Sequence, residues 1–400
     1  MAERMSERRT ALLGALLATI GPISMSIYTP AMPELVAAFR TTEGMIKLTL
    51  SLYFAGFSVA QLLSGPLSDA IGRRRAVLAF IGINAVGGVI CSLSPSVEWL
   101  LAGRLVQGIG ASVGITVARA MVRDQFTGEA ASRIMNLIGI MLAVGPALAP
   151  TLGGLALAAF GWQAIFLMLI GFSSLIILSV TLLMRETTEP DPMRAAPRRI
   201  LNAYRMLLVD RRFLSAAGVL AGAVGSLYAQ STMLPFILID RVGLSPLAFA
   251  VGMLMQSGFY FLGSVMLRVA SPRLGGLPAV RIGLLCLIGG GSLIALFSAL
   301  LTPSYASVMG PIALTSFGIA FLTPHMTTAA LQGVPHVAGA ASALIGFLQL
   351  GTGFAGGLFA ALVGEPLTAF GLIVPAFCLA ATLSFLIFRQ VTPEAMRHGA

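Results

Sequence analysis

The sequence predicts an all-α polytopic membrane protein, and its composition and the spacing of its apolar residues carry that prediction. Of its 400 residues, 57% are hydrophobic and 10% are charged, whereas an average soluble domain carries roughly 25% charged residues. So few polar groups do not cover the surface of a soluble fold. The apolar residues also gather into runs of about 20 residues, the length of a transmembrane helix. Soluble enzymes and disordered chains are therefore disfavoured.

Twelve apolar runs are present, and each is expected to form one membrane-spanning helix. A long charged connection near the chain midpoint separates the first six runs from the last six. The sequence thus predicts two pseudo-symmetric six-helix bundles, residues 1–184 and 213–400, joined by a cytoplasmic central linker, residues 185–212. At the end of the linker and the start of the seventh run, residues 200–213 are expected to form an amphipathic helix on the membrane surface. The expected spans are residues 11–33, 47–67, 76–94, 97–119, 134–158, 163–184, 213–237, 247–268, 280–300, 305–325, 338–362 and 366–388.

The basic residues lie in short clusters between the apolar runs, so the net charge of +10 does not indicate nucleic-acid binding. Most of them fall in alternate loops, on the side of the membrane that also holds Arg8 and Arg9. Only Arg40, Lys47 and Arg241 fall on the other side. Because cytoplasmic loops carry an excess of Lys and Arg, both termini are predicted to be cytoplasmic.

The connection between the second and third runs carries the first informative motif, GPLSDAIGRRR, residues 65–75. A glycine at the end of a span lets a neighbouring helix approach closely. Asp69 precedes Arg73 by four residues, a spacing that permits a local ion pair. A simple positive-inside anchor needs the arginines alone and leaves Gly65, Asp69 and Gly72 unexplained.

This motif resembles the loop between helices two and three of the major facilitator superfamily, with Ala70 in place of the usual arginine. The resemblance implies a twelve-helix transporter in which Gly65, Asp69, Gly72, Arg73 and Arg74 serve gating. It also implies that Asp69, Arg73 and Asp124 form a charge cluster that holds the two halves closed on the cytoplasmic side. The alternative is that all three are loop charges in solvent.

Arg104 lies inside the fourth run, within the segment LAGRLVQGIGA. An arginine inside a membrane span is costly and is a functional candidate by default. The segment is similar to a second motif of the same superfamily, which implies a part for Arg104 in proton coupling. The structural alternative is that Arg104 pairs with helix-end carbonyls or with Gln107.

The fifth run carries GPALAPTLGG, residues 145–154, where proline kinks a helix and glycine permits close packing. The stretch resembles the motif of exporters in the superfamily. With residues 28–34, 48–61, 118–124 and 161–166, it is similar to the bicyclomycin/chloramphenicol-resistance exporters, and the similarity is clearest in the N-terminal half. The residues expected to kink or pack helices are Gly108, Gly145, Pro146, Pro150, Gly153 and Gly154.

Proton coupling requires a group that titrates within the membrane path. The exporter subgroup usually carries an acid two positions before Tyr28, but this chain has Ser26 there, and none of its 15 acids lies at a span centre. The candidates for coupling, besides Asp124, are Arg104, Glu34, Asp240 and His325.

Substrate contacts are expected near the midplane, between the two halves. The apolar walls and scarce fixed charges favour neutral or lipophilic substrates. For each polar side chain, helix packing is the alternative role. The candidates are Tyr28, Tyr53, Asn136, Tyr228, Gln230, Gln256, Tyr260 and Gln349.

The sequence thus predicts a secondary transporter of the bacterial inner membrane that exports small, mostly apolar compounds by alternating access, in exchange for protons. Its expected partners are the small-molecule substrate, protons and the lipid bilayer, with no nucleic acid, no cofactor and no metal, and it is expected to be a monomer. Uptake or facilitated diffusion without proton coupling is the main alternative. An intramembrane enzyme is a remote one, because such a site needs clustered acids, His or Cys within the spans.

Overall fold

The computed structural model describes residues 5–391, and throughout that range the regular structure is helical. Twelve helical segments within it are long and apolar enough to cross a membrane. The predicted all-α class and the predicted number of spans are therefore confirmed. The ends, residues 1–4 and 392–400, which carry the predicted cytoplasmic termini, lie outside the described residues.

The chain folds as two compact units, and helix α3 contributes to both of them. The first unit comprises the described part of Met1–Thr41 together with Leu52–Asn202, and the second comprises Thr42–Ser51 and the described part of Ala203–Ala400. The first unit holds α1 (Glu7–Ser26), η1 (Thr29–Ala31), α2 (Met32–Ala38), most of α3 (Glu43–Ile71), α4 (Arg73–Ser92), α5 (Val97–Ala111), α6 (Val113–Gln125), α7 (Gly128–Phe160), α8 (Trp162–Leu183) and η2 (Pro192–Ala195). The second holds α10 (Arg211–Ser231), the π-helix η3 (Phe236–Arg241), α11 (Pro246–Gly252), α12 (Leu254–Leu274), α13 (Gly276–Leu300), α14 (Tyr305–Gln332), η4 (Pro335–Val337), α15 (Ala338–Val363) and α16 (Pro366–Val391).

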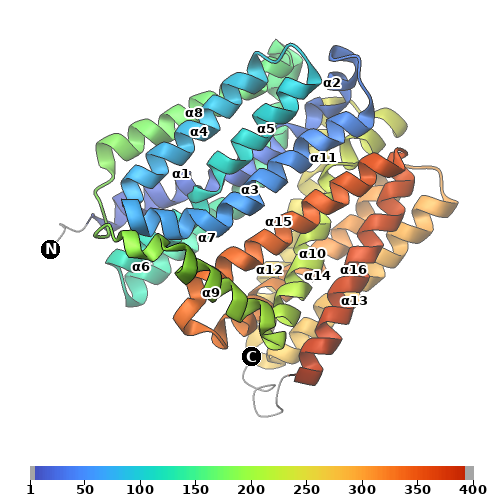
Figure 1. Cartoon of the computed structure of the whole chain (residues 1–400). Helices are drawn as coiled ribbons and strands as arrows, with labels where there is room; N and C mark the ends of the chain where they lie inside the picture. Colours follow the sequence, from blue (N-terminus) through green and yellow to red (C-terminus); the bar gives the residue numbers. More distant parts are fainter. Residues whose placement is uncertain (1–4, 392–400) are drawn as a thin grey trace. The chain divides into compact units, whose positions relative to one another are not determined.

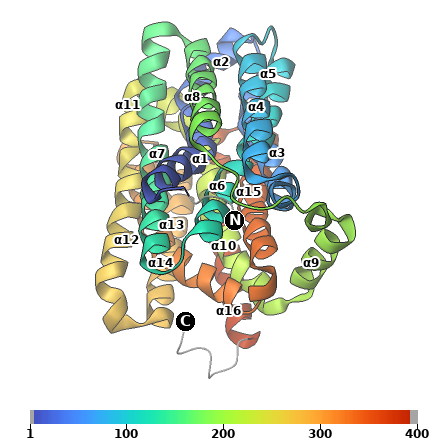
Figure 2. The same cartoon turned by 90° about the vertical axis from the view of Figure 1, so that its left-hand side faces the viewer.

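In the first unit, α4 packs against both α5 and α8, and α1 packs against α6 and α7 (Figures 1 and 2). A buried apolar cluster joins α1, α4, α6, α7 and α8, with Leu13, Leu17, Ile81 and Ile176 fully buried in it. Exposed leucines and valines lie on the outer faces of α4, α7 and α8, as expected for surfaces that face lipid. In the second unit, α13 packs between α14 and α16, and α10 packs against α15 and α16 (Figure 1).

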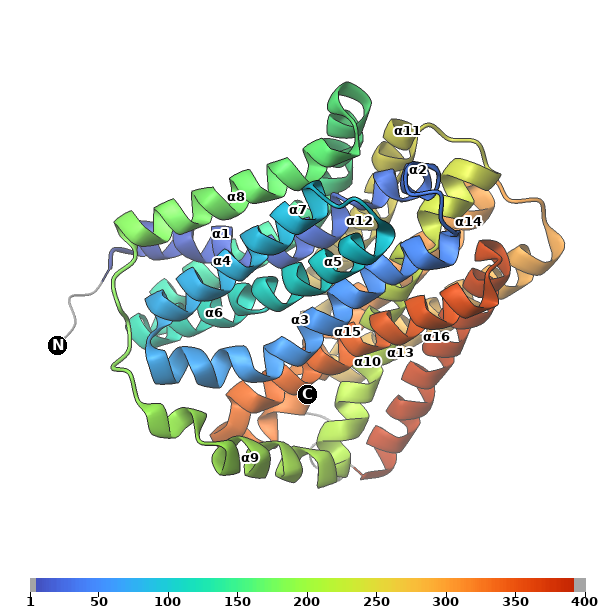
Figure 3. The same ribbon diagram turned by 45° about the horizontal axis from the view of Figure 1, so that its top comes forward.

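Glycine allows α5 to approach α3 so closely that their backbones touch. A Cβ atom at Gly108 would lie 2.1 Å from the carbonyl oxygen of Tyr53, a distance that real Cβ atoms essentially never show. Such contacts between small residues are the usual way in which membrane helices pack. Figure 3 shows α5 and α3 side by side, as this close approach requires.

The central linker contains a helix, as the sequence predicted, although its bounds differ. The observed helix α9 covers Pro197–Val209 and stops where the side chain of Asp210 caps the start of α10. Leu207 is buried, while Leu201 and Leu208 remain exposed beside arginines of the same helix.

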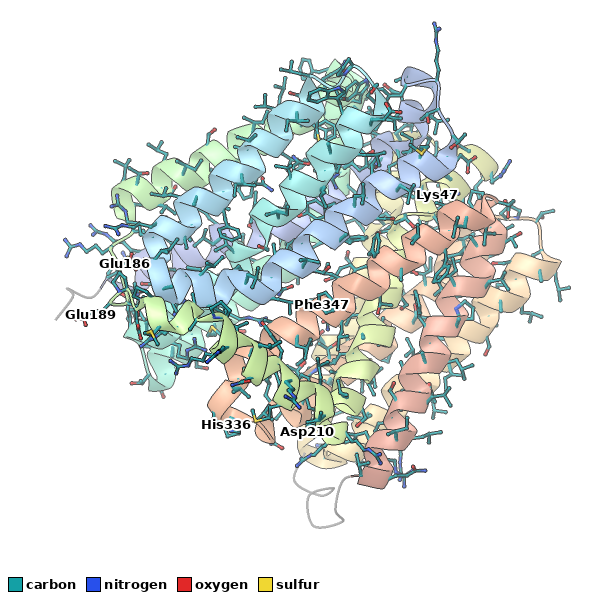
Figure 4. The ribbon with its side chains drawn as sticks, in the orientation of Figure 1. Lys47, Glu186, Glu189, Asp210, His336 and Phe347 are labelled. Carbon is teal, nitrogen blue, oxygen red and sulfur yellow. The ribbon has the colours of Figure 1, made fainter. Side chains whose placement is uncertain are left out.

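Lys47 occupies a place that the charge pattern did not predict. We expected it among the outer loop charges, but it lies in the second turn of α3 with a fully buried side chain (Figure 4). Its ammonium donates to the carbonyl of Gly364 at 2.9 Å and to Glu43 at 3.4 Å, and it faces the Phe236 ring at 5.2 Å. The aliphatic part of the Lys47 side chain therefore lies in apolar surroundings, and its ammonium group binds the C-terminal end of α15.

We predict that Gly108→Ala lowers the unfolding free energy by about 2 kcal/mol, because the added methyl forces α5 away from α3. The matched control is Gly139→Ala, since Gly139 is an exposed helical position with open space around it. The control should be neutral or gain up to about 1 kcal/mol from helix propensity. Thermal unfolding of the two purified variants in detergent measures the difference. Equal melting temperatures for both variants would contradict the close packing.

Candidate functional site

The structure brings Asp69, Arg73 and Asp124 together in the first unit. Arg73 forms ion pairs with Asp69, four residues earlier, and with Asp124, whose carboxylate lies 3.1 Å from the guanidinium Nε. The Ser68 hydroxyl accepts a third hydrogen bond from Arg73, at 2.6 Å. The Arg73 side chain is 4% exposed. An arginine buried among two carboxylates and a hydroxyl is a strong, geometrically specific charge cluster.

Glu186 completes this site, and the sequence analysis missed it. Its carboxylate, just after α8, accepts hydrogen bonds from the backbone N–H groups of Arg73 (2.6 Å) and Arg74 (3.2 Å) at the start of α4 (Figure 4). An acid at a helix N-terminus satisfies free donors and complements the helix dipole. Gly72 precedes that helix with φ +97°, and a Cβ there would lie 2.5 Å from Glu186. The backbone conformation therefore favours glycine at position 72, and a side chain there would displace the Glu186 carboxylate.

The rest of the motif ties neighbouring elements to the cluster. Arg74 donates to the carbonyl of Thr181 on α8, at 2.8 Å. The carbonyl of Asp69 accepts from the backbone N–H of Asp191, at 3.2 Å, so the beginning of the central linker is anchored here. At Gly65, a Cβ would be in ordinary contact with Thr116 on α6. The motif residues predicted from sequence thus lie in one connected network.

Arg104 forms a second charged site, fully buried within the first unit. Its Nη1 donates to Gln107 at 2.8 Å and to the backbone carbonyl of Ser24 at 3.2 Å. Its guanidinium carbon lies 4.7 Å from the ring centroid of Tyr28 and 4.5 Å from that of Tyr53. These are cation–π distances, so two aromatic faces supply part of the charge compensation.

Tyr28 and Tyr53, which the sequence predicted as contacts of the substrate, are buried partners of Arg104. Both are fully buried. The hydroxyl of Tyr53 donates to the carbonyl of Gly21 at 2.9 Å, and the ring of Tyr28 packs on Phe166 at 5.6 Å between centroids. The arrangement fixes both rings against the guanidinium.

Four of the remaining cavity candidates make polar or close contacts in the second unit. Gln230 donates to Gln256 at 3.2 Å. Tyr228 lies near Tyr260, and the hydroxyl of Tyr260 lies near Thr323. Of the other two candidates, Gln349 is half-buried on α15, and Asn136 is exposed on α7 in the first unit.

The candidates for proton coupling do not form one site. Glu34 is exposed on the short helix α2. His325 is half-buried in α14, and its Nε2 has no partner among the described residues. Asp240 lies in η3, outside the spans; burial and then the Glu43 carboxylate raise the pKa of Asp240, while Arg241 opposes that shift. The surroundings of Asp240 therefore favour its protonated form.

Helix α7 runs without a break through the exporter-like glycine and proline segment. Pro146 and Pro150 both lie inside the 33-residue helix. A Cβ at Gly145 would be in contact with α1, and one at Gly153 would lie 2.0 Å from the carbonyl oxygen of Ile27. Gly153 and Gly154 are both buried. The segment therefore serves close packing against the end of α1.

The chain belongs to the Major Facilitator Superfamily, whose family model matches residues 14–357. It is 27% identical to multidrug resistance protein D of Escherichia coli (strain K12), over 94% of each chain. It is 31% identical to a chloramphenicol resistance protein of Pseudomonas aeruginosa, over 85% of this chain and 81% of that one. Its fold matches the xylose transporter XylE from E. coli with a TM-score of 0.72, at 12% identity and over 97% and 98% of the two chains. The protein is thus a multi-pass membrane transporter, and the resemblance to drug exporters is confirmed.

We predict that Glu186→Gln lowers the unfolding free energy by about 1 kcal/mol, because the start of α4 loses its charge-assisted capping bonds. Glu189→Gln is the matched control: it removes the same charge from an exposed linker position (Figure 4). The difference is measured by thermal unfolding in detergent at low and at high salt. If the two variants have the same melting temperature, Glu186 does not cap α4.

Proposed function

We propose that this transporter exports small, mostly apolar or neutral compounds by alternating access, as a multidrug efflux protein that exchanges its substrate for protons. In this proposal it works as a monomer in the bacterial inner membrane with both termini in the cytoplasm. Two six-helix bundles, residues 1–184 and 213–400, rock about a central site and are joined by the linker at 185–212.

The observation that carries the proposal is the closed cluster of Asp69, Arg73, Asp124 and Glu186. Its ion pairs and capping bonds join the ends of α3, α4 and α6 with the segment after α8. All four residues lie in the first unit, so the cluster is suited to hold one end of that unit together as a rigid body during rocking. The names of the two drug-resistance relatives support export as the direction.

A second candidate function is transport without proton coupling, and one observation favours it. Arg104, the charge deepest in the first unit, has no carboxylate partner within the described residues. An arginine stays charged at every physiological pH, so it does not itself carry the exchanged proton. Under the main proposal, the proton is bound instead by Asp240, Asp124, Glu34 or His325.

We expect expression of the chain in a pump-deficient bacterium to raise the resistance to several compounds of a drug panel that includes chloramphenicol. Asp124→Asn should lose at least half of that gain, because the cluster around Arg73 is weakened. Glu129→Gln, an exposed acid at the start of α7, is the control and should keep it. Increased sensitivity, or increased accumulation of the compounds, would instead identify an uptake protein.

Proton exchange is tested on purified protein with a pH indicator. Addition of an exported compound should release protons, and Asp240→Asn should reduce the release if the raised pKa of Asp240 marks the coupling group. Export without proton release would remove the antiport proposal and leave the uncoupled alternative.

A further inference from the structure

The guanidinium of Arg104 has hydrogen-bond donors that the fold does not use. Nη1 is satisfied by Gln107 and by the carbonyl of Ser24, but Nε and Nη2 are buried and reach no acceptor in the described chain. Unmade hydrogen bonds of a buried charged group are costly, and native structures rarely leave them. Two unused donors on one buried arginine therefore call for a ligand.

The unused groups around Arg104 are themselves of one chemical kind. The hydroxyl of Ser24 and the amide nitrogen of Gln107, both on residues that bond Arg104, are also buried and have no partner among residues 5–391. Together with Nε and Nη2 of Arg104, all four atoms are able to donate a hydrogen bond. Three of these atoms, Nε and Nη2 of Arg104 and the amide nitrogen of Gln107, only donate, and the Ser24 hydroxyl is able to donate as well as accept, so the group is complementary to an anion.

The charge balance leads to the same conclusion. Arg73 is paired with two carboxylates, but no ion pair within the described part of the chain includes Arg104. The rings of Tyr28 and Tyr53 face the guanidinium and supply negative π-faces, which offset a buried cation only in part. The planar guanidinium fork binds a carboxylate through two parallel hydrogen bonds, and the free Nε and Nη2 are adjacent donors on that fork.

We propose that Arg104 is a specificity-determining residue that binds the carboxylate of an acidic aromatic compound, with Ser24 and Gln107 as further donors. The apolar body of the compound packs near the rings of Tyr28 and Tyr53. This inference rests on the proposed transport function and changes its substrate class, from neutral compounds to mostly apolar compounds that carry one negative charge.

The proposal also supplies a driving force that needs no titrating group. A compound with one negative charge leaves a cell whose interior is at negative potential, because the membrane potential drives anions outward. This driving force belongs to the second candidate function, transport without proton coupling, because a chain without an acid at its span centres is then able to export such compounds without exchanging protons. The absence of an acid at Ser26 and the lack of a carboxylate partner for Arg104 among the described residues are both consistent with export of an anion that is not coupled to protons.

The test compares matched carboxylate and carboxamide probes on the purified full-length protein. The probes are benzoate and benzamide, 2-naphthoate and 2-naphthamide, and biphenyl-4-carboxylate with its amide, measured by equilibrium dialysis. For at least one pair, the wild type should bind the carboxylate ten times more tightly or better. Arg104→Gln should bring that ratio close to one, Arg104→Lys should keep part of it, and Ser24→Ala should reduce it several-fold. Arg133→Gln, an exposed arginine of the same unit, is the control and should leave the ratio unchanged.

Several outcomes would overturn the proposal. One is that the wild type prefers no carboxylate, and another is that Arg104→Gln keeps the full preference. A third is that chloride displaces the carboxylate probe at equal concentration, since the site would then hold an inorganic ion. The melting temperature of ligand-free Arg104→Gln should equal or exceed that of the wild type, because an unmatched buried charge is removed. If Arg104→Gln unfolds at a lower temperature and Arg104→Lys shows no carboxylate preference, Arg104 is structural.

Failure of the export proposal and failure of the anion-site proposal give different results. If the protein confers no resistance but binds carboxylates through Arg104, the export proposal fails and the anion site stands. If it exports neutral drugs and Arg104→Gln exports them equally, with no carboxylate preference in the wild type, the anion site fails and export stands.

Discussion

The fold of the first unit is organised by the need to accommodate positive charge in an apolar interior. The two buried arginines solve that problem differently. Arg73, at a helix end, is matched by Asp69 and Asp124 and sits beside the acid that caps its own helix. Among the described residues, Arg104, within a span, meets only carbonyl and amide oxygens and two aromatic faces. A cluster whose positive and negative charges are paired is suited to hold helix ends together. A buried positive charge without a carboxylate partner is suited to bind an anion.

Close packing of helices at glycines makes the arrangement of Arg104 between two tyrosine rings possible. Gly108 brings α5 onto the backbone of Tyr53, and Gly153 brings α7 onto the carbonyl of Ile27, next to Tyr28. Both tyrosine rings are thereby held over Arg104, which α5 carries one turn before Gly108. A larger residue at either glycine would displace a ring from the guanidinium. The small residues of the motifs therefore act through helix separation and not through chemistry of their own.

The sequence predicted the features that depend on local patterns. Twelve spans follow from hydropathy, and the cluster of Asp69 and Arg73 follows from an acid and a base four residues apart. Contacts between distant segments carried no comparable signal. Lys47 was expected among the charges on the outer side, but it is fully buried because it bonds a carbonyl 317 residues away. Tyr28 and Tyr53 were found as polar aromatic residues inside spans, but their common partner depends on the packing of three helices. One sequence signal could have predicted the role of Glu186. It is an acid that directly follows a span, in a chain where a glycine directly precedes the start of another helix.

The most direct test of an unmatched charge at Arg104 is a double-mutant cycle between Arg104→Gln and Ser24→Asp, followed by thermal unfolding in detergent. Ser24→Asp places a carboxylate on the residue whose carbonyl already bonds the guanidinium. The charge balance predicts that Ser24→Asp raises the melting temperature when Arg104 is present and lowers it in Arg104→Gln, since a buried carboxylate then lacks its partner. If Ser24→Asp changes the melting temperature by the same amount in both backgrounds, the positive charge of Arg104 is already compensated, and the account is wrong.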